Sequence, residues 1–229
     1  MQKTILGVGA HYDDCVFGIP GTLLQAVRKN HKVIILTLIG DYSNWPPVQD
    51  GRAEEMIERT TAISKDYGVE MRYLSFASMS LQHDERAKRE AAEAIAEIQP
   101  DTAFMLWPAD THPDHVAGSA IAKTALRWAG RVLDRETKRP ARIYQYDNGP
   151  RHTIGFEPDT YVDVSDDWKQ AIEWLGRFRA YVVNRPFDPG VLSAPQKAKE
   201  SLARYRGQAC GVEYAEAFKS FEPYPQEIL

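Results

Sequence analysis

The stretch Thr4-Ile5-Leu6-Gly7-Val8-Gly9-Ala10-His11-Tyr12-Asp13-Asp14 decides the fold prediction, because an apolar run passes directly into a polar cluster. The run that ends at Ala10 has the length and composition of a buried β-strand. The same arrangement recurs later, where Phe104-Met105-Leu106-Trp107 precedes Thr111-His112-Pro113-Asp114-His115. Because ligands in open α/β sheets lie beyond the carboxyl ends of the strands, both clusters fall where a site is expected.

Strand and helix patterns alternate outward from the first stretch through the first two thirds of the chain. The pattern predicts further strands over residues 32–39, 71–74, 102–107 and 142–146, and helices over residues 20–29, 52–67, 87–98 and 114–133. Residues 32–39 are apolar on both faces, as is typical of a central parallel strand. This alternation favours an α/β fold with a Rossmann-like, mostly parallel sheet and helices on both faces.

The last third of the chain has a different pattern. Residues 161–164 alternate in polarity and predict an edge strand, and residues 168–178 and 196–209 predict helices. We therefore expect a single domain over residues 1–229, with a Rossmann-like core over about 1–150 and a C-terminal helical extension over about 151–229. The loop from Gly40 to Gly51 is long for a strand-to-helix connection, which suggests a functional role.

Composition excludes several classes of protein. The 229 residues are 43% hydrophobic and 26% charged, with a net charge of -4, which is ordinary for a globular chain and gives no reason to expect a nucleic-acid partner. No apolar run approaches the ~20 residues of a membrane span, and the N-terminus lacks a signal-peptide pattern. The two cysteines form no disulfide framework. We expect a cytoplasmic protein with reduced thiols.

The two polar clusters contain the ligand types of a catalytic metal site. Two imidazoles and a carboxylate can hold a divalent cation and leave one position open for water. We expect His11, Asp14 and His115 to bind Zn²⁺, although the ligand types alone also allow another divalent metal. Ferrous iron for oxygen chemistry is a less suitable alternative, because it would leave the neighbouring Asp13 without a role.

The remaining residues of the clusters suggest hydrolysis. Asp13 is expected to act as the general base that takes a proton from water. His112 is expected to stabilise the oxyanion or to protonate the leaving amine, and Asp114 to orient His112. A non-catalytic metal-binding or sugar-binding protein is the alternative, but such a protein would not need Asp13 and His112 in addition to three ligands.

Two other interpretations of the first stretch are weaker. Gly7 and Gly9 match the first two glycines of a dinucleotide-binding motif, but Tyr12 occupies the position of the third. Cys15 lies beside the aspartates and could be a nucleophile, although a buried and inert cysteine is the simpler expectation.

The paired motifs resemble those of the PIG-L/LmbE-like family of zinc-dependent N-deacetylases. The family motifs Ala-His-Pro-Asp-Asp-Glu and His-Pro-Asp-His correspond to residues 10–15 and 112–115. The resemblance implies the same assignments for the metal ligands, the base and His112, with an N-acetylglucosamine-type conjugate as the substrate. Amide cleavage of a thiol conjugate is the alternative activity among relatives. Relatives often form trimers or hexamers, so a homo-oligomer is expected.

Other segments extend the resemblance. Gly21-Thr22, Arg52-Ala53-Glu54-Glu55 and Cys210–Phe218, which contains Tyr-Ala-Glu-Ala-Phe, are similar to family segments. The chain departs from the family pattern in three places: Tyr12 replaces a proline, Cys15 replaces a glutamate, and residues 76–79 lack a frequent aspartate. The first two departures leave the expected ligands in place, and the third bears on substrate preference.

Four residues are predicted substrate contacts. Arg52 corresponds to a family arginine that often contacts substrate. Asp41 and Trp45 could line a sugar pocket, because an aromatic face stacks on a pyranose and short polar groups bond hydroxyls. Tyr146 ends the strand predicted at 142–146 and could reach the site.

Overall fold

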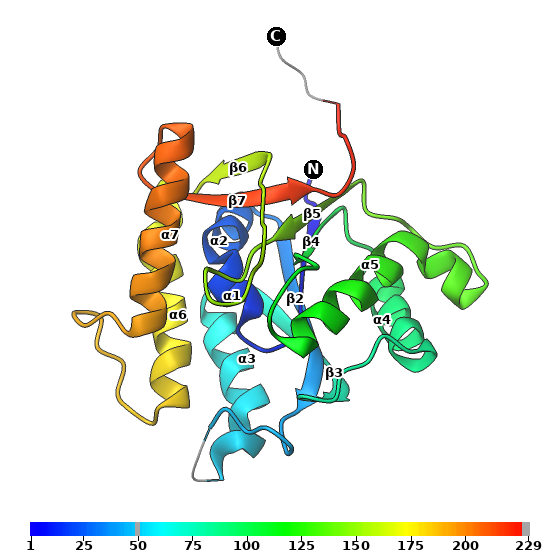
Figure 1. Ribbon diagram of the computed structural model, residues 1–229, viewed down its shortest axis with the longest axis horizontal. Helices are drawn as coiled ribbons and strands as arrows, with labels where there is room; N and C mark the ends of the chain where they lie inside the picture. The colour runs from blue at the N-terminus through cyan, green and yellow to red at the C-terminus, as the bar shows by residue number, and fades with distance from the viewer. Residues whose placement is uncertain (49–50, 226–229) are drawn as a thin grey trace.

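A seven-stranded sheet runs through the middle of the computed structural model, which describes residues 1–48 and 51–225 (Figure 1). The strand order is β3-β2-β1-β4-β5-β7-β6. The strands are β1 (Thr4–Gly9), β2 (Lys32–Asp41), β3 (Val69–Ala77), β4 (Thr102–Leu106), β5 (Arg142–Tyr146), β6 (Thr160–Asp163) and β7 (Ala215–Ser220). The first five strands are mutually parallel, which confirms the predicted fold class.

Helices cover both faces of the sheet, with α4 and α5 on one side and the other helices on the opposite side (Figure 1). They are α1 (Asp14–Gly18), α2 (Pro20–Arg28), α3 (Met56–Asp66), α4 (Glu85–Ile98), α5 (Pro113–Leu133), α6 (Trp168–Val182) and α7 (Ala194–Cys210), with 3₁₀ turns η1 (Arg52–Glu55) and η2 (Ser165–Asp167). The segment predicted as one helix over 52–67 is divided between η1 and α3. No helix among the described residues is both long and apolar enough to cross a membrane.

The centre of the sheet brings the two polar clusters together. Strands β1 and β4 are hydrogen-bonded neighbours, with Gly7 opposite Phe104 and Val8 opposite Met105. Both strands are almost completely buried, because helices cover both of their faces. Since parallel neighbours end at the same edge of a sheet, the loops that follow β1 and β4 lie side by side.

The last third of the chain contributes strands as well as helices. Helices α6 and α7 occupy the predicted helical segments, and β6 is an edge strand as predicted. Strand β7 was not predicted; it lies between β5 and β6 and is antiparallel to both. The sheet therefore continues from the first two thirds into the last third. The single domain over residues 1–229 stays a prediction.

Candidate metal centre and catalytic cavity

The loop after β1 is folded around the Asp14 carboxylate. Asp14 Oδ2 accepts hydrogen bonds from the backbone N–H groups of Ala10 at 2.7 Å and His11 at 2.8 Å. Gly9 allows this close approach, since a Cβ at this position would lie 2.9 Å from the Asp14 Cβ. The loop thus places the side chains of His11 and Asp14 together at the start of α1.

The loop after β4 is organised by the first turn of α5. His112 is the N-cap of this helix, and its Nδ1 accepts a hydrogen bond from the Asp114 backbone N–H at 3.2 Å. The His112 N–H in turn donates to Asp110 Oδ1 at 2.8 Å. These bonds fix His112, Asp114 and His115 within one helical turn.

Donor atoms of three residues from the two loops converge as a metal site requires. His115 Nε2 lies 3.2 Å from His11 Nδ1 and 3.2 Å from Asp14 Oδ1, and His11 Nδ1 lies 3.8 Å from Asp14 Oδ2. Tetrahedral zinc with bonds of about 2.1 Å separates its donor atoms by about 3.4 Å. The observed spacing therefore fits the predicted ligand set. His112 is close enough to belong to the same cluster, in which nitrogens of His11, His112 and His115 lie within 4.8 Å of one another.

The outer nitrogen of each of two histidines faces a carboxylate. His11 Nε2 lies 3.0 Å from Asp114 Oδ2, and His115 Nδ1 lies 3.1 Å from Asp110 Oδ1. The hydrogen bond to Asp114 holds the His11 proton on the outer nitrogen and leaves the inner nitrogen free to bind a metal. His115 Nδ1 is within ion-pair distance of Asp110 but makes no hydrogen bond to the described residues. The prediction that the Asp114 carboxylate orients His112 is wrong: this carboxylate contacts His11, and only the Asp114 backbone contacts His112.

The charges of the cluster also favour a cation. Burial opposes charge on His11 and His115, but the carboxylates outweigh it and raise the pKa of His11 to about 9 and that of His115 to about 10. Burial likewise opposes ionisation of Asp14, yet the His115 charge and hydrogen bonds from both histidines hold its pKa well below the usual range. The cluster therefore favours two positive charges near neutral pH. One divalent cation can supply these charges in place of the extra protons on His11 and His115.

Asp13 and His112 differ from the proposed ligands in their electrostatics. Burial and the neighbouring Asp14 charge raise the pKa of Asp13 to about 6. Burial and the positive charges of His11 and His115 lower the pKa of His112. Near neutral pH, Asp13 is therefore a carboxylate able to accept a proton, and His112 is a neutral imidazole. Because His112 Nδ1 accepts a hydrogen bond, we infer that its proton is on Nε2.

The structure adds residues that the sequence prediction did not assign. Asn148 Nδ2 donates to Asp14 Oδ1 at 2.8 Å from the loop after β5, and so supports the orientation of this carboxylate. Asp110 contacts His115, and His152 forms a second group of possible ligands with both. The one sequence signal for Asn148 was its position directly after a predicted strand. Neither spacing nor motif pointed to His152.

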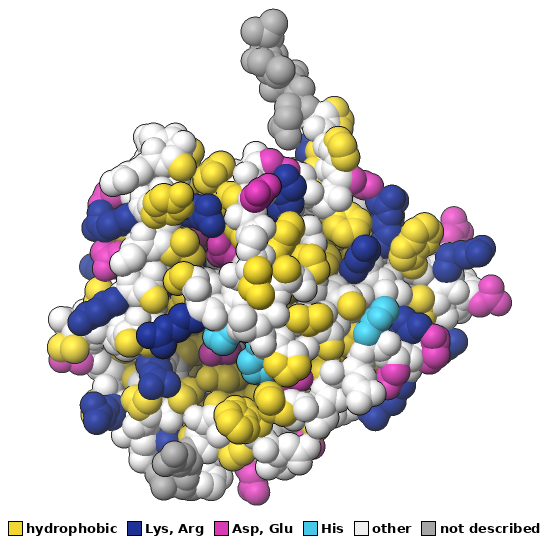
Figure 2. Space-filling model, in the orientation of Figure 1, with side chains coloured by type: hydrophobic (Ala, Val, Ile, Leu, Met, Phe, Trp, Pro, Cys, Tyr) yellow, Lys and Arg dark blue, Asp and Glu magenta, His cyan; other side chains and the backbone are white. Residues whose placement is uncertain are grey.

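A cavity of about 540 Å³ opens over the cluster, and Figure 2 shows a hollow with histidine and acidic atoms at its floor. This volume is within the range of small-molecule sites, which is about 300–1,000 Å³. Its walls combine aromatic, aliphatic and polar side chains from loops after β1, β2, β4 and β5 and from α6 and α7. The lining includes His11, Asp13, Asp14, Tyr42, Trp45, His112, His115, Asn148, Arg151, His152, Phe178 and Arg179.

Of the predicted substrate contacts, only Trp45 lines the cavity. This residue is 60% exposed, so its side chain is accessible to a ligand. Asp41 is exposed, is not part of the cavity lining, and accepts a hydrogen bond from the Ser43 backbone N–H. Residues 49–50 of the long predicted loop lie outside the described part of the chain.

Tyr146 is a core residue and not a substrate contact. Its side chain is fully buried, its hydroxyl donates to Val8 O at 3.0 Å, and Cys15 Sγ lies 3.3 Å from the same hydroxyl. Burial raises the pKa of the Cys15 thiol far above its usual range. Cys15 is therefore buried and protonated, as the simpler expectation held, and is not a nucleophile.

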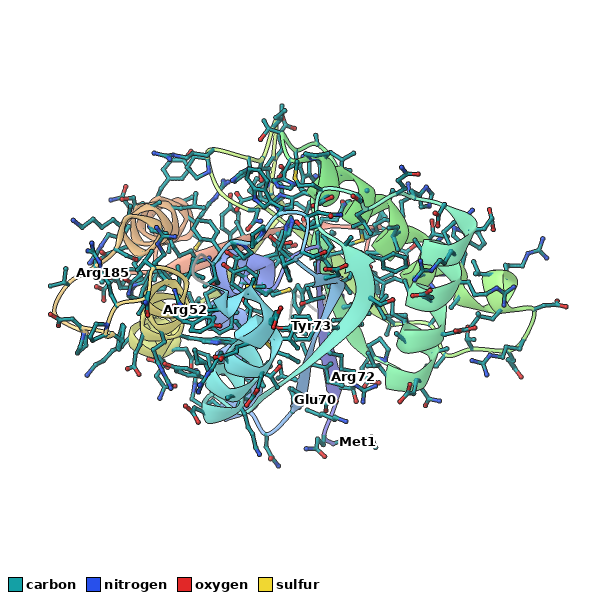
Figure 3. The ribbon with its side chains drawn as sticks, turned by 90° about the horizontal axis from the view of Figure 1, so that it is seen from below. Met1, Arg52, Glu70, Arg72, Tyr73 and Arg185 are labelled. Atoms are coloured by element: carbon teal, nitrogen blue, oxygen red, sulfur yellow. The ribbon has the colours of Figure 1, made fainter. Side chains whose placement is uncertain are left out.

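Arg52 also lies outside the cavity lining, beside the end of α6 (Figure 3). Its Nη1 donates to Tyr181 O at 2.7 Å, and the Tyr181 hydroxyl donates to Arg52 O at 2.8 Å. The guanidinium also stacks on the Tyr181 ring, with 5.3 Å between the guanidinium carbon and the ring centroid. Arg52 therefore secures the C-terminal turn of α6, and the prediction of a direct substrate contact is wrong for this structure.

The chain is similar in sequence and in fold to known proteins. The chain is 25% identical over 228 residues to a diacetylchitobiose deacetylase from Thermococcus kodakarensis, covering 95% of this chain and 82% of the relative. The crystal structure of the conserved protein TT1542 from Thermus thermophilus is similar with a TM-score of 0.82 and 27% identity, covering 99% of this chain and 98% of that one.

The fold alone does not specify the reaction. A 4-carboxy-2-hydroxymuconate hydratase from Pseudomonas putida KT2440 has the same fold, with a TM-score of 0.81, 17% identity and full coverage of both chains. Family assignment therefore depends on the sequence match. The family described as PIG-L, GlcNAc-PI de-N-acetylase, matches residues 6–126, which is more than half of the chain and includes both polar clusters. The chain belongs to the PIG-L family of N-deacetylases.

Proposed function

We propose that this protein removes the N-acetyl group from an N-acetylglucosamine-type conjugate in a metal-dependent hydrolysis. The observation that carries the proposal is the convergence of His11, Asp14 and His115 beside the carboxylate of Asp13, at the floor of one cavity. The family match and the deacetylase from Thermococcus kodakarensis support this reaction type.

We propose Zn²⁺ as the metal, held by His11 Nδ1, His115 Nε2 and the Asp14 carboxylate. Two nitrogens and one oxygen suit zinc, although they do not exclude iron or manganese. When bound, the metal would lower the pKa of water and polarise the acetyl carbonyl. Asp114, Asp110 and Asn148 would hold the ligands in orientation, as their contacts with His11, His115 and Asp14 indicate.

The protein's own groups then divide the proton transfers. Asp13 accepts a proton as the water oxygen bonds to the acetyl carbonyl carbon. His112 donates a hydrogen bond from Nε2 to the oxygen that develops negative charge, a role that its lowered pKa favours over that of an acid. When the C–N bond breaks, the proton held by Asp13 is available to the leaving amine, and acetate and the free amine are the products.

Trp45 is the proposed sugar contact, because it lines the cavity, is exposed, and an aromatic face can stack on a pyranose ring. A cytoplasmic location and a trimer or hexamer remain predictions. Amide cleavage of a thiol conjugate and non-catalytic binding remain the alternatives, and the following experiment separates them.

The test is a deacetylation assay on a panel of N-acetylglucosamine conjugates, including a thiol conjugate, with metal-loaded and chelator-treated protein. We expect acetate release only from loaded protein and its recovery when Zn²⁺ is restored. Binding of conjugates without acetate release would favour the non-catalytic alternative. Turnover confined to the thiol conjugate would favour the amidase. Full activity after the metal content falls to zero would refute the proposed mechanism.

A further inference from the structure

The outer lining of the cavity is cationic, in contrast to its floor. Arg151 and Arg179 line the cavity, whereas the acidic residues among the described lining are Asp13 and Asp14, both part of the cluster at the floor. Figure 2 shows Lys and Arg side chains along one side of the hollow. The chain as a whole has more acidic than basic residues, 32 against 28, so this local charge is not a property of the entire surface.

Neither guanidinium has a carboxylate partner within 4.0 Å among the described residues. Arg177, on the same helix as Arg179, shows the contrast: it pairs with Asp66 at the surface and does not line the cavity. Arg151 and Arg179 therefore present unpaired positive charge to the cavity, and no salt bridge within the described part of the chain accounts for their position.

The backbone that carries each arginine is held in place. Arg179 lies on the face of α6 that also brings Leu175, Phe178 and Val182 to the cavity, and the Arg52–Tyr181 pair secures the end of this helix. This gives Arg52 an indirect role in the site, through the helix that forms one wall.

Arg151 lies in the loop after β5, which is joined to the loop after β4. The Thr111 N–H donates to His152 O at 2.9 Å, and Asp110 and Thr153 form an isolated β-bridge. The backbone around Arg151 is thus tied to the same loop that carries His112. Both arginines are exposed, so their long side chains remain free to meet a ligand at the mouth of the cavity.

We propose that the substrate carries an anionic group, a phosphate or a carboxylate, on the part of the molecule attached to the amino sugar, and that Arg151 and Arg179 bind this group. The proposal rests on the proposed deacetylase function, because it places the acetamido group at the floor and the anion at the mouth. Guanidinium groups suit this role, since they bind carboxylate and phosphate through two parallel hydrogen bonds.

The test compares three probes: the neutral methyl glycoside of N-acetylglucosamine, its carboxymethyl glycoside and N-acetylglucosamine 1-phosphate. Acetate release is measured for zinc-loaded wild type, Arg151→Gln, Arg179→Gln and the double variant. Arg185→Gln is the matched control, because Arg185 lies on the exposed loop after α6 and does not line the cavity (Figure 3). Dissociation constants for the same probes are measured with Asp13→Asn protein, so that binding is read independently of turnover.

We expect wild type to favour one or both anionic probes over the neutral one in kcat/KM. Each cavity variant should lower kcat/KM for the favoured probe by about tenfold, mainly through KM, with a change below about twofold for the neutral probe. The preference should weaken as ionic strength rises. Arg185→Gln should match wild type on all probes. Which anionic probe is favoured distinguishes phosphate from carboxylate.

Equal kcat/KM and equal affinity for neutral and anionic probes would overturn the inference, as would variants that impair all probes equally. If no probe releases acetate but the anionic probes bind more tightly than the neutral one in an arginine-dependent way, the deacetylase proposal fails and the anion site stands. If the neutral probe alone is turned over and bound, the deacetylase proposal stands and the anion site fails.

Discussion

A buried ion pair between α7 and β7 offers a direct test of how the last third of the chain is attached. Lys199 Nζ lies 3.1 Å from Glu216 Oε1, and both side chains are almost fully buried. Lys199 Nζ also donates to Gly18 O at 2.6 Å, and Glu216 accepts the backbone N–H groups of Gly21 at 3.0 Å and Thr22 at 2.8 Å. The pair therefore joins the C-terminal helix and strand to α1 and α2.

The change Lys199→Met removes the cation and keeps most of the side-chain volume. Removal of one partner from a buried ion pair destabilises proteins by about 3–5 kcal/mol, because the remaining charge is buried without compensation. Glu216 would keep two backbone N–H partners at the N-terminus of α2, where the helix dipole also favours negative charge. We therefore expect a loss at the lower end, about 3 kcal/mol. For a chain of this size, that loss lowers Tm by about 6–12 °C.

The assay is urea unfolding followed by circular dichroism for wild type, Lys199→Met, Glu216→Gln and the double variant. If the charge left behind causes the loss, the double variant should be destabilised by less than the sum of the single variants. A Lys199→Met protein within about 1 kcal/mol of wild type would refute this account of the ion pair, since the pair would then contribute no more than an exposed one.

Four further predictions concern the site and the core. Asp13→Asn should retain its metal content, measured by atomic emission, while kcat falls by about 10²–10⁴-fold, because the general base is lost; an unchanged kcat would remove Asp13 from that role. Asp114→Asn should weaken metal affinity about 10–100-fold in a chelator competition through its contact with His11, and wild-type affinity would contradict that contact. Trp45→Ala should raise KM for sugar conjugates with little change in kcat, because Trp45 lines the cavity. Tyr146→Phe should change the free energy of unfolding and leave KM unaffected, because the Tyr146 hydroxyl contacts core atoms. The reverse pattern would restore Tyr146 as a substrate contact.

Sequence patterns predicted six of the seven strands and most helices, because burial on one or both faces leaves a regular apolar pattern. Strand β7 was missed, since Ala215–Phe218 shows no simple alternation and all four residues are buried. The segment was recognisable only by its resemblance to a family motif. In the structure, the Glu216 carboxylate explains the position of this strand, because it accepts hydrogen bonds from the first turn of α2, almost two hundred positions earlier.

The amino-acid sequence by itself predicted that each polar cluster follows a buried parallel strand, at the edge of the sheet where ligands bind. It also determined the ligand types available there. That the two clusters meet was decided by the strand order, which places β1 beside β4. Only the tertiary structure decided which carboxylate faces which imidazole, why Arg52 secures a helix and Tyr146 lies in the core, and which arginines reach the cavity. These outcomes depend on contacts between side chains from segments far apart in the chain, and neither periodicity nor local spacing carries that information.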